Sequence, residues 1–174
     1  MPVSPSTDNY YVGKGKLSFK ATDELTFRDL GNVTELETTP NLTTSEHFSS
    51  REGVKKKDKE VVTEKKLTVR LVMDEWTAAN LAMALLGDVS VDVDGNSVVD
   101  IFSRNAFEGE LKYVGTNEIG PQMDIDLFKV AFKPGKSLSP ISDEWGNIEI
   151  EGEALADALG KFGTWTVREQ VVGP

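Results

Sequence analysis

Apolar and polar residues alternate along most of this chain with a period of two, which is typical of β-strands that bury one face. Leu17, Phe19 and Ala21 alternate with lysine and serine, so a strand is predicted from about Tyr10 onward. A second run of this kind, rich in valine and leucine, covers residues 60–74. Further strands, each ending at Gly, Pro, Asn or Asp, are predicted over residues 26–38 (with a turn or bulge at 31–32), 89–102, 107–115, 123–134, 146–155 and 163–169.

One segment has helical periodicity instead. Residues 78–86 place apolar side chains on one face, Thr77 can cap the first backbone N–H groups, and Gly87 is suited to a left-handed terminator. Two segments lack any apolar pattern: residues 1–9, predicted as a flexible N-terminal arm, and residues 39–60, predicted as a long inter-strand loop. The fold class that follows is a mainly antiparallel β protein, a sandwich or partly closed barrel, with one flanking α-helix.

The composition of the chain is that of an ordinary globular domain. The chain has 174 residues, 39% hydrophobic and 28% charged, and contains no cysteine, as expected for one globular domain made in a reducing cytoplasm. No apolar run reaches the length of a membrane span, and the N-terminus lacks the features of a signal peptide. We therefore expect no membrane association.

Charge is distributed unevenly along the chain. The formal net charge is -10; residues 1–70 sum to +1, and residues 71–174 to -11. Despite this, four lysines stand within residues 55–59, in the same stretch of the chain (46–62) as the single histidine, His47. Acids interrupt the lysine run and no aromatic residues are interleaved with it, so nucleic-acid binding is disfavoured. Two interpretations of the lysine run remain open. It is either the soluble tip of a hairpin or an electrostatic contact with an acidic surface of another copy.

Three predicted strands carry carboxylates at every second position, opposite valine, isoleucine, methionine or leucine. The simplest interpretation is a solvated sheet face. The alternative is a surface kept negative so that a polyanion does not adhere to it. Paired catalytic carboxylates are disfavoured because these acids form rows and not one isolated pair. The acids of these rows are Asp92, Asp94, Asp124, Asp126, Glu149, Glu151 and Glu153.

Familiar chemical motifs are incomplete. The segment 92–100 lacks ligands of an EF-hand loop, and its Asp94-Gly95 pair is better explained as a hairpin turn. "GKGKLS" departs from the phosphate-loop pattern in the first glycine and in the residue after lysine. His47 has nearby serines but no nucleophile elbow. We expect no enzymatic activity, no cofactor and no metal.

The order of several segments is informative. "NYYVGKGKLSF", "RDLGNVTELETTP", "EHFSSREGVKKKD" and "LVMDEWTAANLAMALLG" follow one another, and "FKPGKSLSPISDEWGNIEIEGEALAD" comes later. Together they resemble the major tail tube protein of long-tailed (siphovirus-type) bacteriophages, over about residues 9–172. The resemblance implies a phage tail tube fold: a single domain over residues 10–172, without the immunoglobulin-like C-terminal domain of some relatives.

The resemblance also implies a function. Subunits of that family close into hexameric rings, which stack around a tape measure protein and end at tail terminator and tail tip proteins. The tube is part of the virion tail, is made in the host cytoplasm, and conducts viral DNA without binding it specifically. In that family the early inter-strand loop reaches the adjacent ring. This implies an inter-ring interface made by His47, Phe48, Ser49, Ser50, Arg51, Glu52, Lys55, Lys56 and Lys57.

In a DNA conduit the acidic rows would keep the wall from binding DNA, because carboxylates repel phosphates whereas cationic walls would bind them. Asp92, Asp94, Asp124, Asp126, Glu149 and Glu151 are therefore candidates for the lumen wall. The alternative function is a monomeric β-sandwich that binds a carbohydrate or protein. Such modules usually present exposed aromatics, whereas the three tryptophans, Trp76, Trp145 and Trp165, are expected to pack in the core or at an edge.

Overall fold

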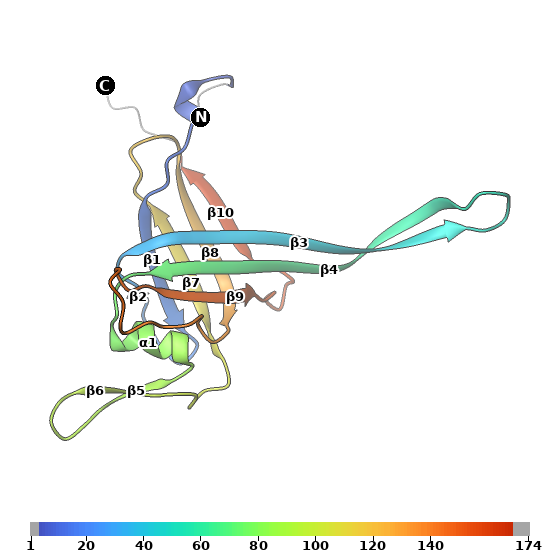
Figure 1. Cartoon of the computed structure of the whole chain (residues 1–174). Helices are drawn as coiled ribbons and strands as arrows, with labels where there is room; N and C mark the ends of the chain where they lie inside the picture. Colours follow the sequence, from blue (N-terminus) through green and yellow to red (C-terminus); the bar gives the residue numbers. More distant parts are fainter. Residues whose placement is uncertain (1–3, 169–174) are drawn as a thin grey trace.

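The computed structural model describes residues 4–168 and is built mainly of antiparallel strands (Figure 1). Its single described α-helix flanks the sheet, so the predicted fold class is confirmed. The elements are η1 (Thr7–Asn9), β1 (Gly15–Ala21), β2 (Arg28–Asp29), β3 (Val33–Ser49), β4 (Lys56–Met73), α1 (Ala78–Leu85), β5 (Asp88–Val91), β6 (Ser97–Asp100), β7 (Phe107–Gly115), β8 (Gln122–Phe132), β9 (Ile148–Ala154) and β10 (Gly163–Arg168).

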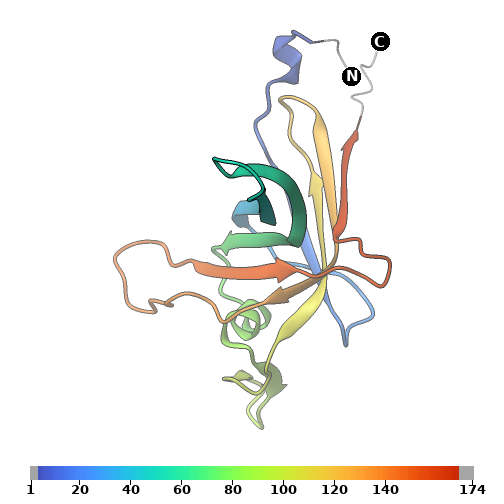
Figure 2. The same ribbon diagram turned by 90° about the vertical axis from the view of Figure 1, so that its right-hand side faces the viewer.

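The main sheet divides into two layers at β8. Its strand order is β2-β1-β7-β8-β9-β4-β3, and β10 also pairs with β8. One edge of β8 pairs with β7, while its other edge pairs with β10 over Gln122–Leu127 and with β9 over Val130–Phe132. Beyond this fork, β1, β7, β8 and β10 form one layer and β9, β4 and β3 form the other (Figure 2).

The core lies between these layers. Leu17 and Phe19 of β1 are at most 2% exposed and join Leu71 of β4 and Ile150 of β9 in one apolar cluster. Phe19 also contacts the ring of Phe132 edge-on, with centroids 5.5 Å apart. The alternation of apolar and polar residues in the sequence therefore indicates which side of each layer faces the core.

The sheet does not close into a barrel. In the order of strands, β2 and β3 stand at opposite ends and do not pair with each other. Pro40 lies within β3, which is tolerated because β3 is an edge strand whose outer backbone groups need no partner in the ladder.

Helix α1 begins as predicted. The Oγ1 of Thr77 accepts a hydrogen bond from the N–H of Asn80 at 3.2 Å. The predicted left-handed terminator was wrong by one residue: Leu86 has φ 48° and ψ 52°, and Gly87 follows it. Leu86 is 5% exposed, and burying a leucine, worth about 1.5–3 kcal/mol, offsets the cost of about 1–2 kcal/mol for its backbone. Glycine is needed at position 87 because a Cβ would lie 2.5 Å from the Asp100 carbonyl.

The predicted loop over residues 39–60 was wrong. Strands β3 and β4 run through most of it as a long hairpin, and only residues 50–55 form its turn. The apolar alternation is missing because neither face of this ribbon is covered by the rest of the chain, so burial places no demand on its sequence. The threonines that resembled a loop are also good strand formers.

Other boundaries also differ. The first strand begins at Gly15 and not at Tyr10, because its ladder with β7 ends at the pair Gly15–Gly115. Of the predicted arm, residues 7–9 form a 3-10 helix, and residues 1–3 lie outside the described residues, as does the end of the predicted domain beyond residue 168. The hairpin turn predicted at Asp94-Gly95 is present between β5 and β6, with Gly95 at φ 85°.

Candidate functional site

The long hairpin projects from the body of the subunit (Figure 1). Strand β9 pairs with β4 only over Leu67–Met73, so the part of the ribbon beyond Pro40 and Leu67 has no other strand beside it. From Asn41 to Ser49 it spans roughly 30 Å at about 3.4 Å per residue. Such a projection gains no stability from burial within its own chain, which is expected of a segment that contacts another molecule.

Two β-bulges shape this ribbon. Thr63 and Asp58 are the extra residues on β4, at the register shifts between Thr43 and Thr44 and between His47 and Phe48. The Oγ1 of Thr63 donates to the Thr43 carbonyl at 3.1 Å. Bulges increase local twist and bend the strands, in agreement with the turned outer end of the ribbon in Figure 1.

Ion pairs hold the outer end of the hairpin together. Lys57 bonds Glu46 at 2.6 Å and also contacts Glu60, while Asp58 lies 2.6 Å from the Nδ1 of His47. The hydrogen bond to Glu46, followed by that to Glu60, raises the pKa of the Lys57 ammonium. The hydrogen bond from Lys57 lowers the pKa of the Glu60 carboxyl. These charges are neutralised within the hairpin. Because the pairs are exposed, each contributes little to the stability of the fold.

Other lysine and arginine side chains at the end of the hairpin are free to contact another molecule. Arg51, Lys55, Lys56 and Lys59 are exposed and form no ion pair with any residue in the described part of the chain. Over residues 50–59, which we call the basic tip, there are five Lys or Arg and two acids. The tip is therefore a positive end on a chain with net charge -10.

The structure places the nine predicted inter-ring residues together at the outer end of the hairpin, in the basic tip and the strand residues just before it. Phe48 is 44% exposed there, an apolar side chain without a core to enter. These residues occupy the end of β3 (His47, Phe48, Ser49), the turn (Ser50, Arg51, Glu52, Lys55) and the start of β4 (Lys56, Lys57).

The predicted acidic rows are not brought together. Asp92 and Asp94 lie in the β5–β6 turn and not on a strand face, which corrects that placement. Asp92 is committed to the turn: its Oδ1 accepts the N–H groups of Asp94 and Asn96 at 2.9 and 2.8 Å. The hydrogen bonds from Asn96 lower the pKa of the Asp92 carboxyl.

The remaining acids are largely paired and belong to different layers. Asp124 and Asp126 on β8 face Arg168 and Lys112 at 3.1 and 3.6 Å. On β9, Glu149 contacts Arg70 and Lys136, whereas Glu151 is exposed. Since the alternate residues of both strands enter one shared core, the β8 acids and the β9 acids point outward on opposite sides of the sandwich. The two rows therefore do not form one continuous acidic surface of the subunit.

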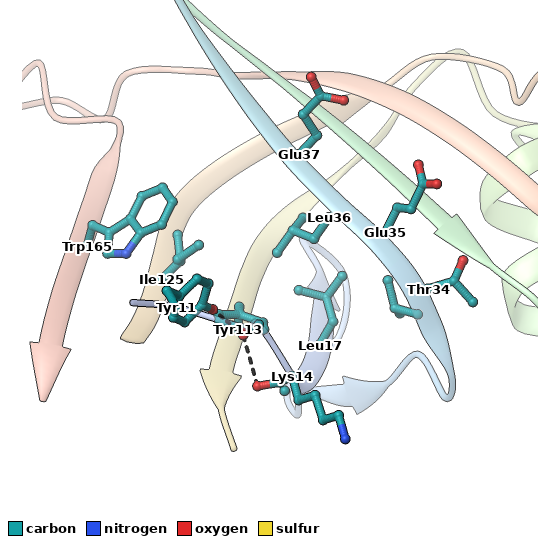
Figure 3. Close-up of a pocket in the computed structure, with 13 residues that line it drawn as sticks. Tyr11, Lys14, Leu17, Thr34, Glu35, Leu36, Glu37, Tyr113, Ile125 and Trp165 are labelled. Carbon is teal, nitrogen blue, oxygen red and sulfur yellow. Dashed lines mark hydrogen bonds between the residues drawn. The ribbon is translucent and has the colours of Figure 1, made fainter. Parts of the chain in front are cut away.

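A cleft of about 470 Å³ occupies the open side of the sheet (Figure 3). Leu36 of β3 and Leu17 of β1 point into it from opposite layers, and Trp165 of β10 borders it. The hydroxyl of Tyr113 donates to the Lys14 carbonyl at 3.0 Å and lies 3.2 Å from the hydroxyl of Tyr11. Burial, with a smaller contribution from that tyrosine, raises the pKa of Tyr113. The cleft contains no arrangement of nucleophile and base, and its walls are the uncovered flank of the core.

A second exposed surface was not anticipated. The segment between β8 and β9 carries Ile141 and Trp145, which are 95% and 98% exposed. The expectation that Trp145 packs in the core or at an edge was therefore wrong, and Trp165 is also 56% exposed. Sequence could have indicated this only through the absence of a periodic pattern around Trp145, since polar and small residues surround it.

The described residues were also compared with the requirements of a metal site and of a membrane-spanning helix. Within residues 4–168, no group of three or more His, Cys, Asp or Glu side chains is placed to hold a metal ion. Among the helices of that same region, none is long and apolar enough to cross a membrane.

Comparisons with known proteins identify a sequence family and a solved structure of similar fold. The sequence matches the family model described as "Protein of unknown function UCP028589" over residues 10–100 and 89–165. The chain belongs to this family. Comparison with curated proteins finds no match. Among solved structures, the fold is similar to a chain from the cryo-EM structure of the sheath-tube complex of PVC, an extracellular contractile injection system, in the extended state.

That similarity covers nearly all of both chains. The TM-score is 0.51 at 9% sequence identity, over 97% of this chain and 100% of the other. At this identity the match establishes a shared fold. It agrees with the tail tube fold that the order of sequence segments implied.

Proposed function

We propose that this protein is a structural subunit of a phage-type tail tube, which self-assembles into stacked hexameric rings through which DNA is delivered. The observation that carries the proposal is the β3–β4 hairpin, whose outer part projects from the body without any covering element. A contact that joins one end of a subunit to a different surface of the next is heterologous, and its repetition generates an open stack.

Two further observations support the proposal. The fold is shared, over 97% of this chain, with a chain of a sheath-tube complex, which is itself an assembled particle. The order of segments resembles the tail tube proteins of long-tailed phages in particular, and the tape measure, terminator and tip proteins are the partners that this resemblance implies. In this role the subunit needs no catalytic residues, and the inter-ring contact is assigned to the nine residues named above at the outer end of the hairpin.

The test is removal of the outer hairpin. Ser45 and Val61 are a cross-strand pair, so replacing residues 46–60 by Asn-Gly should close a shorter ribbon with a two-residue turn. The body should fold unchanged because, among the described strands, only β3 and β4 themselves pair within the removed part. We expect the full-length protein to form rings and tubes in negative-stain electron microscopy, and the shortened protein to form rings that do not stack.

A matched control shortens the other projecting ribbon. Val91 and Ser97 are also a cross-strand pair, and replacing residues 92–96 by Asn-Gly removes a turn of comparable exposure. This variant should still form tubes. Full-length tubes from the variant shortened at residues 46–60 would refute the role of the hairpin. A wild-type protein that stays monomeric and binds a glycan or protein ligand would favour the alternative, a β-sandwich binding module.

A further inference from the structure

The hairpin tip and the exposed tryptophan lie at opposite ends of one strand. Strand β4 starts at Lys56 in the basic tip and ends at Met73, which pairs with Ile148 at the start of β9. Asp74 and Trp76 follow β4 directly, and Trp145 lies shortly before β9. At about 3.3 Å per residue, roughly 55 Å of strand separates these two ends.

A cleft is present at the end away from the tip. Trp76, Pro140 and Trp145 supply apolar walls, Asp74 and Glu144 supply carboxylates, and the volume is about 320 Å³. We call it the tryptophan cleft. Trp145 is 98% exposed, although a tryptophan gains more than most residues from burial. Grouped with Trp76 and Pro140 around one cleft, an exposed tryptophan of this kind indicates a site that another molecule covers.

The charges of the two ends are complementary. Residues 74–76 and 137–146 contain four acids and no Lys or Arg, whereas the basic tip contains five Lys or Arg and two acids. Asp74, Asp143 and Glu144 form no ion pair within residues 4–168, and Lys55 and Lys56 at the tip likewise form none. A lysine or arginine also has favourable cation–π contact with a tryptophan face.

We propose that the tryptophan cleft of one subunit receives the basic tip of another copy of this chain. Lys55 and Lys56 meet Asp143 and Glu144, and Trp145 is covered by the aliphatic or cationic parts of the tip. The proposal rests on the proposed function, which requires a contact between rings but does not say what the hairpin contacts. Because tip and cleft are at opposite ends of β4, repetition of this contact joins copies head to tail.

The β5–β6 ribbon is a competing acceptor. It also contains four acids without a cation and exposes Val91 and Val93. The tryptophan cleft is favoured because it places carboxylates and two tryptophan side chains around one hollow. On the ribbon, by contrast, Asp92 is occupied by its own turn and Asp88 by Arg104, at 2.6 Å.

The experiment is charge reversal with rescue in the full chain. Lys55→Glu with Lys56→Glu should raise the concentration needed for stacking about tenfold or more, and so should Asp143→Lys with Glu144→Lys. The protein carrying all four changes should stack again, and so should an equal mixture of the two double variants, because each tip then finds a cleft of opposite charge. Stacking is measured by sedimentation velocity and negative-stain microscopy.

Controls identify the acceptor. Reversal of Asp94 and Asp100 on the β5–β6 ribbon should leave stacking unchanged and should fail to rescue the tip variant; rescue by this pair would overturn the proposal. Trp145→Ala should weaken stacking, and Trp145→Phe should restore most of it.

A wild-type protein that stacks, with reversal of the cleft charges having no effect, would refute this inference alone. A wild-type protein that forms no rings or stacks would refute the proposed function as well.

Zero-length carbodiimide coupling gives an independent readout. When isotopically light and heavy full-length chains are mixed before coupling, crosslinks between Lys55 or Lys56 of one chain and Asp143 or Glu144 of the other are expected. Crosslinks from the tip to other acids instead would overturn the assignment.

Discussion

At the scale of single residues, Asn80 connects the helix to the sheet. It is 1% exposed, and its Nδ2 donates to the carbonyls of Leu30 and Glu75 at 3.0 and 2.9 Å. Its Oδ1 accepts from Arg28 at 2.7 Å. A buried amide with its donors and acceptor used in this way fixes the position of α1.

Replacing Asn80 should therefore destabilise the subunit. Asn80→Leu keeps the volume but leaves two carbonyls and the Arg28 guanidinium without their partner, at a cost of about 1–3 kcal/mol in the free energy of unfolding. Urea denaturation measures this change. Asn41→Ala on the exposed ribbon is the control and should shift stability by less than about 0.5 kcal/mol. Equal effects of the two changes would contradict this account.

At the scale of elements, the outer face of β4 and β9 is held by a ladder of ion pairs. Arg70 of β4 contacts Glu149 of β9 and bonds Glu35 of β3 at 2.6 Å, while Lys66 contacts Glu153. The hydrogen bonds from Lys136 and then Arg70 lower the pKa of the Glu149 carboxyl. Those from Lys66 and then Lys133 lower the pKa of the Glu153 carboxyl. The acidic row that the sequence presents is thus largely neutralised by its neighbours.

This ladder predicts a loss of stability in acid. A carboxyl whose pKa is lowered by folding contributes fully above its unfolded pKa, about 4.3, and this contribution disappears as the pH falls through the lower folded pKa. Glu149→Gln should therefore flatten the decline of the urea midpoint between about pH 5 and pH 3. Glu118→Gln, an exposed acid that makes no ion pair within residues 4–168, should decline like the wild type. Parallel curves for all three proteins would exclude a role of the ladder.

At the scale of the whole molecule, positive and negative ends are separated along β4. Surface charges interact over roughly 8 Å at physiological salt, and this distance shrinks as salt is added. The contacts between copies that we propose are electrostatic and exposed, whereas the body is held by an apolar core. The two should therefore respond differently to ionic strength.

We expect added salt to dissociate stacks before it unfolds subunits. Raising sodium chloride to about 1 M shortens the Debye length to about 3 Å, so tubes should separate in sedimentation while the circular dichroism spectrum stays unchanged. Trp145→Phe should show the same salt dependence, because it changes an apolar contact and no charge. Stacking that is insensitive to salt would point to Phe48 and Trp145, rather than the lysines, as the main source of affinity.

The sequence by itself determined the class of fold. Period-two alternation identified the strands that bury one face, and the Thr77 cap with its apolar face identified α1, because core burial leaves a direct record in the order of residues. The same reasoning missed the outer β3–β4 ribbon, since strands without a buried face leave no such record. The order of segments, not their periodicity, implied where this ribbon would act.

Only the tertiary structure decided how the charged and aromatic residues are placed. It separated the acids of β8 and β9 onto opposite sides of the sandwich, because the fork at β8 folds one sheet into two layers. It also exposed Trp145 beside Asp74, two positions far apart in the sequence, because the pairing of Met73 with Ile148 brings the end of β4 and the start of β9 together. Such proximity depends on long-range strand pairing, which local sequence pattern does not specify.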